Sequence, residues 1–304
     1  MWALVTGASS GIGRDMSRYL YSLGYSIVIV ARDENKLEEL KQELEKRETN
    51  ITSSVENIKK SNNKLESNVK NNINIYNNKH IEDSSFIDKN KLDDSIKKKQ
   101  QIIVISEDLS KAENCKKLYE KTKHIKIDLL VNNAGFGVFG YFSETDLEKE
   151  INLINTNITA VHILTKLYLR DMISRNKGHI LNVASIAGME PGPLMAAYYA
   201  SKAYVIRLSR AINKELKKQK SSVKISILCP GPVDTNFNNV AKVVFKAPSM
   251  PSEKVAKYGI DKAIKGKLII IPGILNKSVR FFSKIVPDCI LEEVAYHIQR
   301  RKKI

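Results

Sequence analysis

The sequence is poor in cysteine and has no long apolar run, and each shortage excludes a class of protein. Its three cysteines stand far apart, without metal-ligand spacing and without the even count of a disulfide framework: Cys115, Cys229 and Cys289. We therefore expect a reduced, intracellular protein that binds no metal. The longest apolar run, at 268–275, is interrupted by Pro272 and Gly273 and is shorter than the roughly 18 residues of a spanning helix. The expected location is the cytoplasm.

Acidic residues are also scarce, with 33 Asp and Glu against 50 Lys and Arg, which leaves a net charge of +17. Residues 253–304 carry twelve Lys or Arg against five Asp or Glu and end in Arg300-Arg301-Lys302-Lys303. No zinc finger or aromatic ribonucleoprotein motif accompanies this charge. A lysine-rich solvated surface is therefore favoured over a nucleic-acid site.

The first thirteen residues contain a glycine-rich turn in a strand–turn–helix context. An apolar stretch at 2–5 leads into Thr6-Gly7-Ala8-Ser9-Ser10-Gly11-Ile12-Gly13, and Met16, Leu20 and Leu23 then recur at helical spacing. Glycines let the backbone approach a pyrophosphate, and the N–H groups at the helix start favour its negative charge. This pattern predicts a dinucleotide site, and an apolar strand so early in the chain indicates that no leader peptide precedes it.

The next apolar run indicates which dinucleotide is bound. It spans 26–31 and ends at Arg32, where an acidic residue typically binds the ribose 2′-OH of NAD. An arginine at this point favours a 2′-phosphate, and we expect NADP(H) over NAD(H). Asp33 is interpreted as the N-cap of a helix at 34–45.

Residues 47–101 form an insertion rich in Asn, Lys, Ser and Asp, with no glycine or proline. Low hydrophobicity favours disorder. Apolar residues near a 3-4 repeat, from Ile51 to Ile73, favour a helical arm instead. Both alternatives remain open.

Strands and helices alternate through the rest of the chain. Apolar runs predict strands at 102–105, 127–131, 178–184, 223–229 and 268–271, and a helix is expected at 110–123. Such alternation is typical of an α/β protein with one doubly wound parallel sheet, here of about seven strands. Ligands of such folds bind at the carboxyl ends of the strands. We expect this catalytic domain to comprise 1–46 and 102–275, with a helical extension at 276–304.

Tyr198 and Lys202 are four residues apart in a segment with helical character, so they share a helix face. A lysine beside a tyrosine favours the phenolate, and the spacing predicts a lowered Tyr198 pKa and a general acid/base. Tyr199 points about 100° around the helix and is expected to pack.

Six motifs, in order, resemble those of the short-chain dehydrogenase/reductase family. They are the glycine turn, Asn132-Asn133-Ala134-Gly135, Asn157, Ser185, the Tyr198/Lys202 pair, and Pro230-Gly231-Pro232-Val233-Asp234-Thr235. The resemblance implies a Rossmann-like fold and an oxidoreductase that interconverts a ketone and a secondary alcohol by hydride transfer. It covers the chain except the insertion and about the last thirty residues.

The resemblance also implies roles for the motif residues. Tyr198 exchanges the proton, Lys202 lowers its pKa and holds the nicotinamide ribose, Ser185 binds the substrate oxygen and Asn157 holds a water linked to Lys202. Ser185 and Thr235 are equally typical of turn caps. Thr6 and Asn133 are expected to join neighbouring strands. The cofactor-binding set is Gly7, Ser9, Ser10, Gly11, Ile12, Gly13, Arg32, Asp108, Leu109, Asn133, Ala134, Gly135, Tyr198, Lys202, Pro230, Gly231, Val233 and Thr235.

The loops around this pair predict an apolar substrate, because their residues are Phe136, Val138, Phe139, Ala187, Met189, Pro193, Leu194 and Met195. A hydrophobic ketone fits best, and a 3-oxoacyl thioester of lipid metabolism is an alternative. Non-catalytic nucleotide binding or a membrane-surface role are further alternatives.

The segment 276–303 predicts two amphipathic helices. They either close the pocket, contact a second subunit or lie on anionic lipid, and the two protein contacts are favoured over the membrane. We expect a homo-oligomer.

Overall fold

The computed structural model describes residues 1–47, 100–235, 237, 249–282 and 285–300. The insertion expected at 47–101 therefore lies almost entirely outside the described residues. No helix within these ranges is both long and apolar enough to cross a lipid bilayer.

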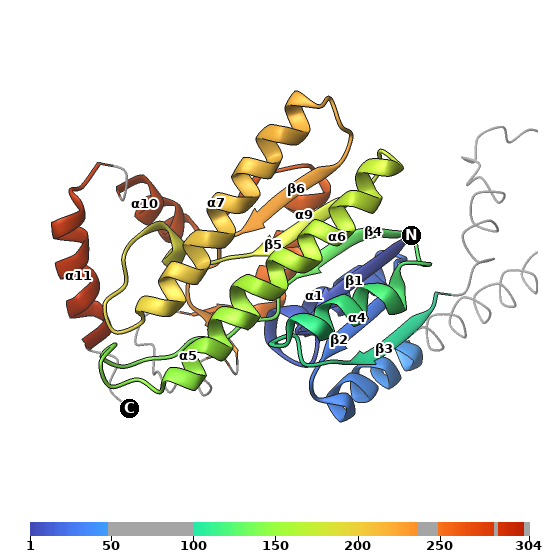
Figure 1. Cartoon of the computed structure of the whole chain (residues 1–304), viewed down its shortest axis with the longest axis horizontal. Coiled ribbons are helices and arrows are strands. Elements are labelled where there is room, and N and C mark those ends of the chain that lie inside the picture. Colours follow the sequence, from blue (N-terminus) through green and yellow to red (C-terminus); the bar gives the residue numbers. More distant parts are fainter. Residues whose placement is uncertain (48–99, 236, 238–248, 283–284, 301–304) are drawn as a thin grey trace, which may run out of the picture.

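A single parallel sheet forms the centre of the molecule (Figure 1). Its seven strands lie in the order β3-β2-β1-β4-β5-β6-β9. The order reverses between β1 and β4, which is the point where doubly wound sheets bind ligands. The predicted seven-stranded fold is confirmed, with strand ends that differ by one or two residues: β1 (Trp2–Thr6), β2 (Ser26–Ala31), β3 (Ile102–Ser106), β4 (Ile127–Asn132), β5 (His179–Val183), β6 (Lys224–Leu228) and β9 (Ile269–Ile270).

The side chains of the central strands alternate between the two faces of the sheet and form a core on each. Helices cover both faces for this reason. Ala3 and Val5 of β1 belong to one core and Leu4 belongs to the other. The first core is covered by α1 (Gly11–Ser22), the helical residues 34–47 and α9 (Ser252–Ile264), the last of which was not predicted. The second is covered by α4 (Ala112–Thr122), α6 (Val161–Ser174) and α7 (Ala196–Lys218).

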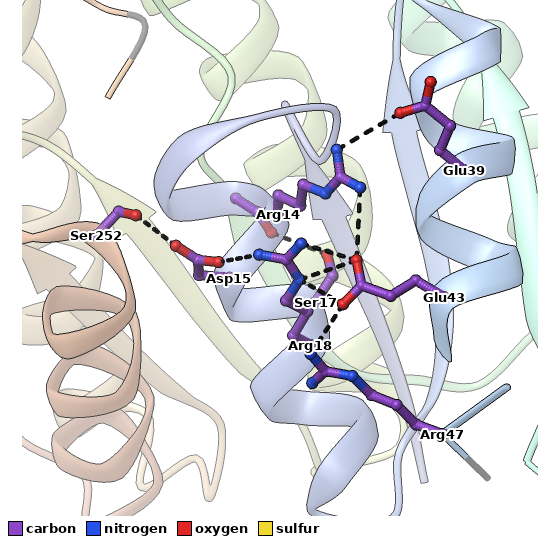
Figure 2. A network of polar contacts seen from close by, with 9 residues as sticks. Arg14, Asp15, Ser17, Arg18, Glu39, Glu43, Arg47 and Ser252 are labelled. Atoms are coloured by element: carbon purple, nitrogen blue, oxygen red, sulfur yellow. Dashed lines mark hydrogen bonds and ion pairs between the residues drawn. The ribbon is translucent and has the colours of Figure 1, made fainter. Parts of the chain in front are cut away.

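A network of charged side chains fixes α1 between its neighbours (Figure 2). Arg14 and Arg18 both reach Glu43, and the shorter contact is the Arg18 Nη2–Glu43 Oε2 pair at 2.7 Å. Burial raises the pKa of Glu43, but the Arg18 guanidinium outweighs this effect and holds the pKa below its ordinary value. On the other side, Asp15 pairs with Arg18 at 2.7 Å and accepts a hydrogen bond from Ser252 at the start of α9. The helix behind the glycine turn is thus held from two directions.

The C-terminal part of the chain adds elements at the carboxyl edge of the sheet. β7 (Val233–Asp234) and β8 (Met250–Pro251) form a second, two-stranded parallel sheet that was not predicted. The two helices expected in 276–303 are present as α10 (Ile274–Phe282) and α11 (Asp288–Arg300).

Candidate active site

The glycine turn joins β1 to α1 at the reversal point of the sheet. Gly7 and Gly11 have φ values of 67° and 53°, which favour glycine. A Cβ at Gly13 would lie 2.3 Å from the carbonyl oxygen of Gly7, so the turn closes only without a side chain there. Ser10 precedes α1 and makes no side-chain cap, and the described first turn holds no acidic residue. The N–H groups of α1 therefore face outward with their partial positive charge uncompensated by a neighbouring carboxylate.

Thr6 and Asn133 join the bases of the two central loops, as predicted. The Thr6 hydroxyl accepts hydrogen bonds from the backbone N–H groups of Asn133 (2.9 Å) and Ala134 (3.1 Å). The Asn133 amide donates to the Thr6 carbonyl at 3.0 Å. These bonds hold the Asn132-Asn133-Ala134-Gly135 turn against the glycine turn.

Arg32 and Asp108 follow the neighbouring strands β2 and β3. Arg32 is exposed immediately beyond β2, and Asp33 accepts a hydrogen bond from the Lys36 N–H at 3.1 Å, which confirms its predicted N-cap role. The Asp108 carboxylate accepts from the backbone and hydroxyl of Ser110, and Leu109 beside it is buried. Both strand ends open on the same edge as the glycine turn.

Tyr198 and Lys202 lie in the first two turns of α7. The Lys202 side chain is buried, its Nζ donates to the Val183 carbonyl at 3.0 Å, and it stands 5.8 Å from the centroid of the Tyr198 ring. Burial lowers the pKa of Lys202 to about 8, with a smaller opposite effect from Cys229. The pair predicted from the i, i+4 spacing is therefore brought together.

The predicted direction of the Tyr198 pKa is wrong. Burial raises this pKa above its ordinary value, a hydrogen bond with Ser185 lowers it by less, and Tyr199 raises it further. Desolvation of the phenolate is the larger effect because the ring lies among Tyr199, Phe237 and the Lys202 stem. Tyr198 is consequently a protonated phenol at neutral pH.

Ser185 caps a turn and lies beside Tyr198, and its contact with the substrate oxygen stays a prediction. It immediately follows Ala184 at the end of β5, and its hydroxyl interacts with Tyr198. The same hydroxyl accepts from the Ala187 N–H at 3.1 Å and so caps a 3-10 turn at Ile186–Met189. The cap fixes the hydroxyl beside the phenol.

Asn157 lies in a π-helical segment, Asn155–Ala160, between α5 (Leu147–Ile154) and α6. A π-helical turn is typical of functional sites. The Asn157 side chain is fully buried, exchanges hydrogen bonds with the Phe136 backbone and donates to Ser201 at 3.0 Å. A Cβ at Gly135 would lie 2.8 Å from Asn157 Oδ1 and 3.4 Å from Lys202 Nζ, so this glycine separates the two side chains.

The Pro230–Thr235 segment closes the cofactor side. A Cβ at Gly11 would lie 2.9 Å from Thr235 Cγ2, so Thr235 stands against the glycine turn. Its hydroxyl accepts from the Phe237 N–H at 3.3 Å, which is the cap alternative. Gly231 packs against Asn276 of α10, and Val233 lies in β7.

The opposite side of Tyr198 is apolar. Its ring lies 5.3 Å from the ring of Phe237, and a Cβ at Gly137 would meet Phe237 at 2.8 Å and Met195 at 3.1 Å. Met195 was predicted to line this side, whereas Phe237 and Ser201 were missed. A hydroxyl inside a helix and a phenylalanine after a loop carry no signal of their own in the sequence. No group of His, Cys, Asp or Glu side chains in the described ranges is arranged to hold a metal.

Together these groups lie at the carboxyl edge of the sheet: a phenol and a hydroxyl beside each other, a buried ammonium, and the glycine turn. Comparison with known proteins agrees with this arrangement. The family model described as short chain dehydrogenase matches residues 1–78 and 83–243. The chain belongs to the short chain dehydrogenase family, and it is an oxidoreductase that acts on CH–OH or C=O groups.

Two curated relatives match this chain at the same sequence identity but over different lengths. The chain is 28% identical over 253 residues to very-long-chain 3-oxoacyl-CoA reductase-B of Danio rerio, covering 82% of this chain but only 64% of that relative, which is less than two thirds of its length. It is also 28% identical over 308 residues to 17-beta-hydroxysteroid dehydrogenase type 3 of Rattus norvegicus, covering 98% of this chain and 83% of the relative.

Solved structures share the fold. A short-chain dehydrogenase from Sphingobium yanoikuyae in complex with NADPH has a TM-score of 0.68 at 21% identity, covering 94% of this chain and 96% of its own. A short chain dehydrogenase/reductase from Burkholderia phymatum in complex with NAD has a TM-score of 0.68 at 22% identity, covering 92% and 91%.

Proposed function

We propose that this protein uses NADP(H) to interconvert a hydrophobic ketone and its secondary alcohol. The observation that carries the proposal is the convergence of Tyr198, Ser185 and Lys202 beside the glycine turn, with the apolar Met195 and Phe237 on the other side. A cytoplasmic location and a homo-oligomeric state remain part of this proposal.

The residues present fit a dinucleotide. The glycine turn packs too tightly to hold side chains at Gly7, Gly11 and Gly13, and the N–H groups at the start of α1 have no side-chain cap. Arg32 is exposed beyond β2, where a guanidinium can pair with a 2′-phosphate. A bound nicotinamide supplies or accepts the hydride. One solved relative is described in complex with NADPH and another with NAD, so the preference for NADP(H) rests on Arg32.

The protein's own residues handle the proton. Because its raised pKa keeps Tyr198 protonated, the phenol can donate its proton to the carbonyl oxygen during reduction, and the phenolate that this leaves is the form that takes a proton back during oxidation. Ser185 donates a hydrogen bond to the same oxygen and stabilises its developing charge. Lys202, held by the Val183 carbonyl, contributes positive charge beside the phenol.

A 3-oxoacyl thioester is the second candidate substrate. It is favoured by the relative named for very-long-chain 3-oxoacyl-CoA, and the net charge of +17 suits an anionic carrier. The relative named for a 17-beta-hydroxysteroid supports a bulky apolar ketone instead. Both candidates use the same catalytic groups.

The test is NADPH oxidation with aliphatic, aromatic and steroid ketones and 3-oxoacyl thioesters, compared between wild type and Tyr198→Phe. We expect the substitution to lower kcat by at least about 100-fold, the size of a general acid/base contribution, while NADPH still binds. Tyr204→Phe is the matched control, because Tyr204 lies on the same helix and its hydroxyl bonds only with the exposed His162 among the contacts described. Equal rates in wild type and Tyr198→Phe would contradict the mechanism.

A further inference from the structure

The C-terminal helix α11 contacts the loop after β4 and also Tyr199 of α7, which packs against the loop after β5. One loop follows β4 and contains Gly140 and Tyr141, and the other follows β5 and contains Gly192 and Leu194. The two loops are joined to each other by a backbone hydrogen bond from the Gly140 N–H to the Leu194 carbonyl at 2.9 Å. Three segments far apart in the sequence therefore meet at one place.

The first contact of α11 is made by Gln299, which is only 2% exposed. Its amide donates a hydrogen bond to the hydroxyl of Tyr199. The Tyr199 ring lies face-on against Gly192, since a Cβ there would come within 2.3 Å of three ring carbons. Its centroid is 6.2 Å from that of Tyr198. A single side chain, that of Tyr199, thus lies between the Gln299 amide and the phenol of Tyr198.

The second contact lies one turn earlier on α11. The hydroxyls of Tyr296 and Tyr141 are 3.0 Å apart, and either can donate. Ala295 and Gln299 are buried at i, i+4 spacing on one side of α11, whereas Glu293 and His297 lie 2.9 Å apart on its exposed side. One side of α11 therefore faces the loops through a small side chain and a buried amide.

Burying an amide costs free energy unless the amide keeps its hydrogen bonds when the helix docks. Such an attachment is favoured where the position of the helix matters. Two directional contacts, one to Tyr141 in the loop after β4 and one to Tyr199 of α7, fix the position of α11 more narrowly than apolar packing alone. Tyr199 is thereby held beside Tyr198, and the Met195 carbonyl accepts the Tyr199 N–H at 3.0 Å while the Met195 side chain lies against Gly137.

From this geometry we infer that α11 is the distal wall of the substrate cleft and that Gln299, acting through Tyr199, is a positioning residue that determines how well long substrates bind. The inference rests on the proposed ketone reduction. A short ketone ends before it reaches Tyr199, whereas a long one extends along the wall.

The experiment compares 2-pentanone and 2-undecanone as substrates with NADPH. Gln299→Leu removes the donor and Tyr199→Phe removes the acceptor of the same hydrogen bond. In each variant we expect KM for 2-undecanone to rise about two- to tenfold, the effect of one lost hydrogen bond, so that the ratio of kcat/KM for the long over the short ketone falls. The double variant should match the single ones, since all three lack the same bond.

His297→Gln is the matched control on the exposed side of α11 and should keep the wild-type ratio. Circular dichroism and the Kd for NADPH establish that each variant is folded, and Tyr199→Phe carries the test if Gln299→Leu does not fold. A wild-type ratio in Tyr199→Phe, or the same change in His297→Gln, would overturn the inference alone. A wild-type protein that reduces no ketone with NADPH would overturn the proposed function and this inference with it.

Discussion

The side-chain amide of Asn157 donates a hydrogen bond to the hydroxyl of Ser201 at 3.0 Å, which joins the π-helical segment to the helix of the catalytic tyrosine. Ser201 in turn donates to the Tyr198 carbonyl at 2.7 Å. Asn157 also exchanges two hydrogen bonds with the Phe136 backbone, so one side chain connects α7 to the loop after β4. These hydrogen bonds fix the loop after β4 relative to the helix of Tyr198.

Asn157→Ala should therefore impair both activity and stability. The change removes both Asn157 partners of the partly buried Phe136 backbone and one of the two hydrogen bonds of the buried Ser201 hydroxyl, which costs about 1–3 kcal/mol of unfolding free energy. We expect kcat to fall at least about tenfold, because small displacements of catalytic groups are costly. Steady-state kinetics and urea denaturation measure the two effects. Asn155→Ala, in the same segment but only partly buried, is the control, and equal behaviour of the two variants would contradict this role.

Much of the site could be predicted from sequence because its signals are local. The glycine turn needs backbone conformations that favour glycine, the Asp33 cap is set by its own helix, and Tyr198 and Lys202 share a face by helical spacing. The order of apolar runs likewise predicts a parallel sheet.

The parts that escaped prediction depend on contacts distant in sequence. Phe237 reaches the site only when the segment after β6 returns to Gly137, and Gln299 meets Tyr199 across 100 residues. The Tyr198 pKa depends on how many groups surround the phenol, which residue spacing does not report. The π-helical turn at Asn157 breaks the regular period on which helix prediction relies.

Arg32→Asp should move the cofactor preference from NADPH towards NADH. The exposed guanidinium beyond β2 is replaced by a carboxylate that repels a 2′-phosphate and accepts a ribose hydroxyl. Loss of one charge-assisted contact predicts a fall in kcat/KM for NADPH of about 10- to 100-fold. Lys41→Asp makes the same charge change on the following helix and should leave the preference unaltered. Equal use of both cofactors by the wild type would show that Arg32 does not discriminate.

Lys202 makes folding stability depend on pH. Burial lowers its pKa from 10.5 to about 8, so between these values the unfolded chain holds a proton that the folded protein has released. The contribution of this group to the free energy of unfolding rises with pH between about 8 and 10.5 and is fully present above 10.5. It is lost as the pH falls through about 8, and the total change is on the order of 3 kcal/mol.

The measurement is urea denaturation of wild type and Lys202→Met from about pH 7 to about pH 9.5. This range stays below the pH at which tyrosines ionise in the unfolded chain. The wild type should gain stability relative to the variant as pH rises, because only the wild type carries the titrating ammonium. Parallel curves would mean that Lys202 is not desolvated in the folded protein.

A buried polar cluster below the site provides the last prediction. Asn182 of β5 is fully buried, donates to Ser209 of α7 at 2.9 Å and accepts from Asn132 of β4 at 2.8 Å. Ser209 also donates to the Val205 carbonyl at 2.8 Å, so its hydroxyl would keep a partner if the Asn182 side chain were removed. The Asn132 side-chain amide would then retain only its bond to Thr165. The helix that carries Tyr198 and Lys202 is thus tied to the sheet one turn beyond Val205.

Asn182→Ala should cost about 3 kcal/mol, since it removes buried hydrogen bonds to strand β4 and to helix α7 at once and leaves one N–H of the buried Asn132 amide unpaired. Ser209→Ala should cost only about 1 kcal/mol, because Asn182 keeps its partner on β4. Urea midpoints of the two variants and of the double variant give the coupling between the residues. Equal losses in the two single variants, or a loss below about 0.5 kcal/mol for Asn182→Ala, would show that the cluster does not hold α7 in place.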